Sequence, residues 1–261
     1  MAATAIIDRP RLEIGRVIGG SFGALRRNWW RVLILALPLE FAPELATIWI
    51  KGHLPALEFG AATPLVRPAV REWVDMAVGF LPDTLMSVYF CRWAAAEMEG
   101  APKGFSLGDP RRVAALLLAV ILADVAVGLA DLLLYVPGMV LGLLWIALAP
   151  VVILEGARPV QALGRSAALT KGHRGRLVLI LAISFVCDMV LRIGVHTAFD
   201  VEVVALGRAH LQTLLALSAI SSALMSTLWA LLWDAGAPVV YFELIRLKTG
   251  VGGWDAAAVF D

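Results

Sequence analysis

Long apolar stretches separated by short charged segments dominate this chain. A bilayer core about 30 Å thick needs roughly 20 mostly apolar residues in one helix. Six stretches come near this length and predict six transmembrane helices, at Trp29–Ile50, Trp73–Ala96, Val113–Tyr135, Pro137–Leu154, Leu177–Ala198 and His210–Glu243. We place a tight turn at Tyr135–Gly138, and the last span is long enough to tilt or to kink at Pro238. The pattern predicts an all-α polytopic membrane protein with one membrane domain, residues 1–261.

Two further segments carry apolar residues on one helical face, namely Ile14, Ile18, Phe22 and Leu25 in the first of them, and arginines elsewhere. They are Arg11–Asn28 and Pro159–Gly172, and such segments are typical of amphipathic helices that lie in the membrane interface. Pro159 suits a helix start and Gly172 a helix stop. The predicted domain therefore comprises an amphipathic segment (1–28), four spans (29–154), an interfacial helix (157–172), two spans (177–245) and a tail (246–261).

The positive charges are distributed unequally between the two predicted sides. Of the 22 lysines and arginines, 17 fall in or beside the N-terminal segment, the second–third and fourth–fifth connections and the tail. An excess of Lys and Arg marks the cytoplasmic side. We therefore expect both termini in the cytoplasm and a multi-pass protein of the bacterial inner membrane. The first residues lack the apolar core of a signal peptide, so we expect the first span to be an uncleaved anchor.

Composition supports a membrane protein and argues against several chemistries. Hydrophobic residues make up 60% and charged residues 16%, against about 25% charged in soluble domains. A net charge of +1 gives no field that would attract nucleic acid. Cys91 and Cys187 are far apart, and the four histidines are scattered. We therefore predict no metal or other cofactor and interpret the cysteines as packing residues.

Acidic residues fall inside most of the predicted spans, where a charge costs about 2.5–3.5 kcal/mol. They are Glu40, Glu44, Asp75, Asp83, Asp124, Asp131, Asp188 and Asp234. Spacing places Glu40 with Glu44, and Asp124 with Asp131, on shared helix faces, and it allows an ion pair between Asp188 and Arg192. These six residues are the candidate polar interior: Glu40, Glu44, Asp124, Asp131, Asp188 and Arg192. The alternatives are a polar cavity or proton path and, the interpretation we favour, structural bonding between helices.

A short internal repeat is a further hypothesis. SFGALRRNWWRVLILAL from Ser21 can be set against SAALTKGHRGRLVLILAI from Ser166, and VYF recurs at Val88–Phe90 and Val240–Phe242. The predicted unit is an amphipathic helix, a span, an outer loop and a second span. Both units would start on the same side of the membrane, as parallel repeats do.

From Pro137 onward the amino-acid sequence resembles that of a known family. VPGMVLGLLWIALAPVVILEGARPVQALGRSAALTKGHRGRL is similar to the glycerophosphoryl diester phosphodiesterase membrane domain family, with a Pro-Gly turn, a span ending in Leu-Glu-Gly, and an Ala-Leu-x-x-Ser helix closed by Gly172. The chain departs from the family pattern at Ala167 and at Arg174-Gly175, where aromatic residues are usual. The resemblance implies the membrane part of such proteins without their catalytic domain, which is a soluble barrel.

Residues Gly172–Gly175 read GHRG and resemble a His-Arg-Gly motif of that phosphodiesterase. Here the motif leads into a predicted span, and no matching acidic motif follows it. We therefore interpret this resemblance as coincidental. The resemblance therefore predicts no enzymatic activity for this chain.

Three functions remain open at this point. The favoured one is a non-catalytic, lipid-associated scaffold or accessory subunit, with other membrane subunits or a second copy as partners. A small permease, coupled to protons through the acids, is the alternative, and a membrane-embedded lipid enzyme is the least supported. We expect anionic headgroups on the cytoplasmic face to contact basic residues of the amphipathic segments, namely Arg11, Arg16, Arg26, Arg27, Arg165 and Lys171.

Overall fold

The computed structural model is all-helical over the residues that it describes, 12–27, 29–43, 45–46, 66–99, 108–133, 135–206 and 211–249. This confirms the all-α class. The helices in chain order are α1 (Ile14–Arg27), α2 (Trp29–Ala36), the π-helix η1 (Leu37–Phe41), α4 (Val66–Glu99), α5 (Pro110–Leu133), α6 (Tyr135–Leu144), α7 (Leu148–Glu155), α8 (Pro159–Thr170), α9 (Arg174–Leu206) and α10 (Leu211–Thr249).

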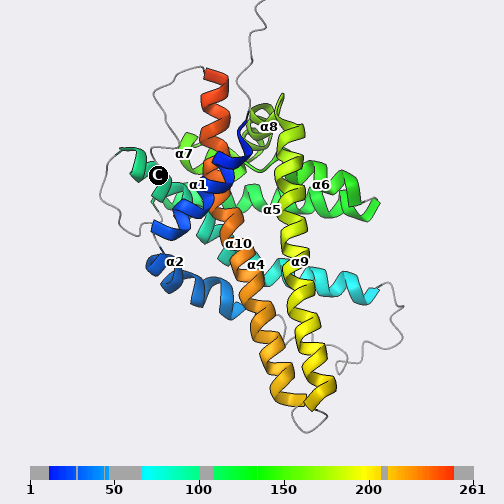
Figure 1. Ribbon diagram of the computed structural model, residues 1–261. Helices are drawn as coiled ribbons and strands as arrows, with labels where there is room; N and C mark the ends of the chain where they lie inside the picture. Colours follow the sequence, from blue (N-terminus) through cyan, green and yellow to red (C-terminus); the bar gives the residue numbers. More distant parts are fainter. Residues whose placement is uncertain are drawn as a thin grey trace, which may run out of the picture.

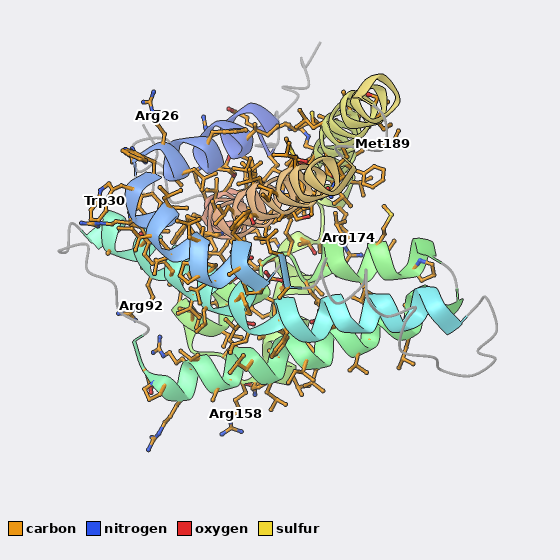
Figure 2. All side chains as sticks on the ribbon, turned by 90° about the horizontal axis from the view of Figure 1, so that it is seen from below. Arg26, Trp30, Arg92, Arg158, Arg174 and Met189 are labelled. Carbon is orange, nitrogen blue, oxygen red and sulfur yellow. The ribbon has the colours of Figure 1, made fainter. Side chains whose placement is uncertain are left out.

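Helix α10 is the element around which the others are arranged. It packs against α1, α4, α7, α8, α9 and η1, and Figure 1 shows it beside α9 as a long hairpin. The axes of helices α4, α5 and α6 lie across the axes of α9 and α10 rather than along them, as both views show (Figures 1 and 2). The described helices therefore form two groups with different axes.

Four helical segments are long and apolar enough to cross a membrane, among the residues that the structure describes. They are Pro110–Ala130, Pro137–Glu155, Arg174–Gly194 and Ala219–Lys248, and they coincide with the third to sixth predicted spans. The second predicted span lies within α4. The first falls on α2, η1 and the residues after them, of which residue 44 and residues 47–50 lie outside the described part. Six spans therefore remain a prediction.

The connection between the third and fourth spans differs from the prediction. Tyr135–Gly138 is helical and begins α6, so the tight turn predicted there is wrong. Pro137 is compatible with this, because the first turn of a helix does not use its backbone N–H groups. A separate break, at residues 145–147, divides the fourth span into α6 and α7. There Ser166 Oγ of α8 donates to the Leu144 carbonyl at 2.9 Å and accepts from the Ala147 N–H at 3.2 Å.

Helix α1, which corresponds to the first segment predicted to be amphipathic, packs closely on α10 by a face of mostly small residues. Val17, Gly20, Ser21 and Ala24 are buried, and a Cβ built on Gly236 of α10 would lie 3.3 Å from Ser21 Oγ. Small side chains at this spacing let two helix backbones approach. Phe22, which belongs to the apolar face predicted from the sequence, is 56% exposed. The buried face is therefore rotated away from the predicted apolar stripe.

The second amphipathic helix begins and ends where its sequence predicts. Helix α8 starts at Pro159, and the chain leaves it through Lys171 and then Gly172, whose φ of +95° suits glycine. Of the proposed repeat, the two VYF motifs lie on α4 and α10, which pack together. Each places its Tyr and Phe rings edge to face, with centroids 5.4 and 5.2 Å apart. The remainder of the repeat stays a prediction, since α2 has 8 residues and α9 has 33.

Candidate polar sites in the helix interior

Three carboxylates from three helices lie near one another. They are Asp83 of α4, Asp124 of α5 and Asp234 of α10, which we call the carboxylate cluster. Asp83 is close enough to interact electrostatically with both Asp124 and Asp234. The three side chains differ in burial, because Asp83 is exposed, Asp124 is half-buried and Asp234 is buried. The cluster therefore leads from the surface of the protein to its interior.

Asp234 is the deepest member of the cluster. It is 9% exposed, and Ser87 of α4 donates a hydrogen bond to its Oδ1 atom. Its Oδ2 atom is buried and has no hydrogen-bond partner. The buried thiol of Cys91, one turn beyond Ser87 on α4, is its next electrostatic neighbour. Buried polar atoms are nearly always hydrogen-bonded. Glu243 Oε2 is also buried without a hydrogen-bond partner, but Glu243 is paired with two arginines, whereas Asp234 Oδ1 is held by the neutral Ser87 hydroxyl.

The structure brings together only part of the predicted polar interior. The ion pair predicted on α9 is present, with Asp188 Oδ2 2.8 Å from Arg192 Nε. Glu40 is buried in η1. Glu44 and the side chain of Asp131 lie outside the described residues, so the two predicted face-sharing pairs stay predictions.

The charged end of α10 is fastened to α1 by a buried carboxylate. Glu243 is 1% exposed, and its Oε1 atom lies 2.7 Å from Arg246 Nη2 and 3.6 Å from Arg16 Nη1. Arg16 also pairs with Glu13 at 3.1 Å. Because a buried charge must be paired, Glu243 holds both arginines in place.

A second paired carboxylate joins α7, α8 and α10 at the same end. Arg165 of α8 contacts both carboxylate oxygens of Glu155, its Nε atom lying 3.0 Å from Oε2. The Tyr241 hydroxyl of α10 donates to Glu155 Oε1 at 3.0 Å. These hydrogen bonds with Glu155 raise the pKa of the Arg165 guanidinium. We call the two groups together the polar clamp, with members Arg16, Glu155, Arg165, Tyr241, Glu243 and Arg246.

The six residues predicted to contact lipid headgroups differ in their surroundings. Arg16 and Arg165 belong to the polar clamp, and Arg27 stacks on Trp93, with its Cζ atom 5.9 Å from the ring centroid. Arg26 and Lys171 are exposed, and Figure 2 shows Arg26 pointing away from the helices. Arg11 lies outside the described residues.

Exposed aromatic side chains lie next to Arg26. Trp29 and Trp30 of α2 are 65% and 49% exposed, and the Arg31 guanidinium lies over the Trp30 ring at 5.0 Å. Figure 2 shows Trp30 at the periphery near Arg26. Tryptophan and arginine together are characteristic of the headgroup level of a membrane.

The histidine of the GHRG motif has cations as its electrostatic neighbours. Burial and the positive charges of Lys248 and Arg176 lower the pKa of His173. A hydrolase motif that holds a metal would need carboxylates near this position. Within the described ranges, no three His, Cys, Asp or Glu side chains are arranged to hold a metal ion.

Sequence spacing did not identify the partners that matter most in these sites. Ser87, Glu155 and Tyr241 carry no local signal, since their partners are up to 147 residues away in the chain. In the sequence, Asp83 and Asp234 were notable only as acidic residues within apolar segments. Helical spacing finds neighbours on one helix, and these contacts lie between helices.

The chain matches no protein-family model, no curated protein and no solved structure.

Proposed function

We propose that this chain is a non-catalytic integral membrane protein that serves as a lipid-associated scaffold or accessory subunit of a membrane complex. The observation that carries this proposal is the polar clamp. Through Glu155 and Glu243 it fastens α1, α7, α8 and α10 at one end of the structure. Such an end can present a fixed surface to other subunits, because leaving the buried Glu243 without its arginines would cost about 3–5 kcal/mol, to which the partly exposed Glu155–Arg165 pair adds a smaller contribution.

The outer surface of two spans supports a lipid or membrane-protein environment. Helix α9 exposes large apolar side chains on several sides, among them Phe185, Val186 and Met189, and Figure 2 shows Met189 pointing outward. Helix α5 exposes Leu118, Ile121 and others. Soluble monomers rarely expose contiguous apolar patches larger than a few hundred Å², so lipid tails or neighbouring spans are the fitting surroundings.

The bacterial inner membrane, with both termini in the cytoplasm, is the location that we propose. Its support is the charge asymmetry of the sequence. Similarity to the glycerophosphoryl diester phosphodiesterase membrane domain family is part of the same proposal and rests on the motifs between Pro137 and Gly172. The cationic surroundings of His173 support a role without phosphodiester hydrolysis.

Anionic headgroups are the proposed lipid partner at α1 and α2. The positive charges there are the exposed Arg26 and the half-buried Arg31, and they lie beside the exposed amphipathic rings of Trp29 and Trp30. Each Lys or Arg near an anionic surface contributes about 1 kcal/mol of attraction.

A proton-coupled permease is the second candidate function, and the carboxylate cluster is the observation that favours it. Ionisable residues within spans often mark proton relays. In proteoliposomes, a permease of this kind would carry protons at a rate that Asp234→Asn abolishes. The scaffold proposal predicts no protein-dependent flux.

The scaffold proposal is tested by extracting the protein from its native membrane in polymer-bounded nanodiscs. We expect a partner membrane protein or a second copy at fixed stoichiometry, with anionic lipid enriched over the bulk membrane. Combined Arg26→Gln and Arg31→Gln substitutions should reduce that enrichment, whereas Arg67→Gln on the opposite predicted side should not. Recovery of only a lone 28.0 kDa chain with bulk lipid composition would contradict the proposal.

A further inference from the structure

The carboxylate cluster contains a buried acid whose surroundings do not compensate a negative charge. Asp234 Oδ1 accepts from Ser87, and Oδ2 has no partner although it is buried. An isolated ionised carboxylate in an apolar interior is so costly that such groups neutralise instead. The charged neighbour of Asp234 is another carboxylate, Asp83.

The groups around Asp234 can be named element by element. Helix α4 contributes Asp83 and Cys91, and the neighbour of Asp83 on α5 is Asp124. The element η1, which packs on both α4 and α10, carries the buried Glu40. Helix α9 carries Asp188, which is paired with Arg192. Helix α1 carries Arg16, paired with Glu243, and Arg27, stacked on Trp93. The charged groups of α7 and α8 that face α10 are Glu155 and Arg165, which are paired with each other. Every one of these groups on α4, α5 and η1 is an acid or a thiol, so none would stabilise a carboxylate at Asp234.

We infer that Asp234 is a proton-binding site, with Oδ2 as the atom that carries the proton and Asp83 as the exposed carboxyl through which the proton is exchanged. When the proton moves inward, the O–H bond of Asp83 breaks and one forms on Asp234 Oδ2. The total charge of the two acids is unchanged. Ser87 holds Oδ1, which leaves Oδ2 as the oxygen available to the proton.

Asp83 is suited to exchange because its side chain is exposed and folds back over Gly79, whose built Cβ would lie 3.4 Å from Asp83 Oδ2. Helix α4 thus carries both the exposed carboxyl and the serine that orients the buried one, four residues apart on one face. The inference concerns binding at equilibrium and rests on neither proposed function.

Infrared difference spectroscopy of the full-length protein in nanodiscs tests this site, because the C=O stretching band reports a protonated carboxyl group directly. We expect such a band at neutral pH in the wild type, its loss in Asp234→Asn, and its retention in the control Asp188→Asn. An unchanged band in Asp234→Asn, or no band in the wild type, would overturn the assignment.

Two milder substitutions keep the test decisive if Asp234→Asn does not fold. Ser87→Ala removes the hydrogen bond to Oδ1 and should shift the frequency of the band, whereas a band with unchanged frequency would contradict Asp234 as its source. Asp83→Asn should slow hydrogen–deuterium exchange of the same band at least several-fold. Exchange at the wild-type rate would overturn the part assigned to Asp83.

Discussion

The two arginines around Glu243 should contribute to stability in a strongly non-additive way. Glu243 is 1% exposed, while its partners Arg16 and Arg246 are 27% and 24% exposed. With either arginine replaced by methionine, which keeps an apolar stem, the carboxylate still has one cation. With both replaced, it has none within salt-bridge distance.

The expected magnitudes follow from this burial. Each single substitution should lower the free energy of unfolding by about 1 kcal/mol, because the arginines are partly solvated and one ionic partner remains. The double substitution leaves a buried carboxylate uncompensated, for which the cost is about 3–5 kcal/mol. The excess over the sum of the two single effects should therefore be at least about 1 kcal/mol.

Equilibrium unfolding in mixed micelles, followed by circular dichroism, measures all three variants against the wild type. Glu13→Gln is the matched control, because Glu13 also pairs with Arg16 but is 60% exposed, and its substitution should change stability by less than about 0.5 kcal/mol. A double variant that costs no more than the sum of the singles would refute the reasoning. So would a Glu13→Gln effect as large as that of the double variant.

Three further predictions concern the connections around α8. Ser166→Ala should cost about 1–3 kcal/mol of unfolding free energy, because it removes the hydroxyl that donates to the Leu144 carbonyl; an effect near zero in the same unfolding assay would count against that contact. Gly156→Ala should cost about 1 kcal/mol, since φ is +69° there, whereas Gly164→Ala, in open space within α8, should stabilise by about 0.5–1 kcal/mol. For His173 the pKa is lowered in the folded protein, so the unfolded chain binds more protons as pH falls below about 6.5, and stability falls with it. His173→Gln should reduce the change in the midpoint temperature of thermal unfolding between pH 7 and pH 5. A variant whose midpoint changes with pH as much as that of the wild type would contradict this.

Features that depend on neighbouring positions in one helix could be predicted from the sequence. The apolar runs predicted the four segments long enough to span a membrane, and the spacing of Asp188 and Arg192 predicted their ion pair. Pro159 and Gly172 predicted the ends of α8 through their backbone preferences. In each case the determining interaction lies within a few residues along the chain.

Features that depend on packing between helices were not predictable in this way. Apolar periodicity placed Phe22 on the face of α1 predicted to lie in the membrane interface, and it gave no sign that the small side chains of Gly20, Ser21 and Ala24 form the face that packs on α10. In an apolar environment packing density selects the interface, so hydrophobicity alone does not identify it. The contact of Ser87 with Asp234 likewise depends on how α4 crosses α10, which no local pattern encodes.

Cysteine labelling in native membranes tests the central claim, that this chain is an integral membrane protein, at the exposed apolar surface of α9. Cys187 is exposed on that surface, whereas Cys91 is buried. Thiols react as thiolates, which lipid disfavours. We predict that a charged maleimide leaves Cys187 unmodified in both sealed and opened membranes, modifies it after unfolding in detergent, and rapidly modifies a cysteine introduced by Arg174→Cys at the charged end of α9. Modification of Cys187 in the native membrane as fast as that of the introduced cysteine would contradict a lipid-facing α9.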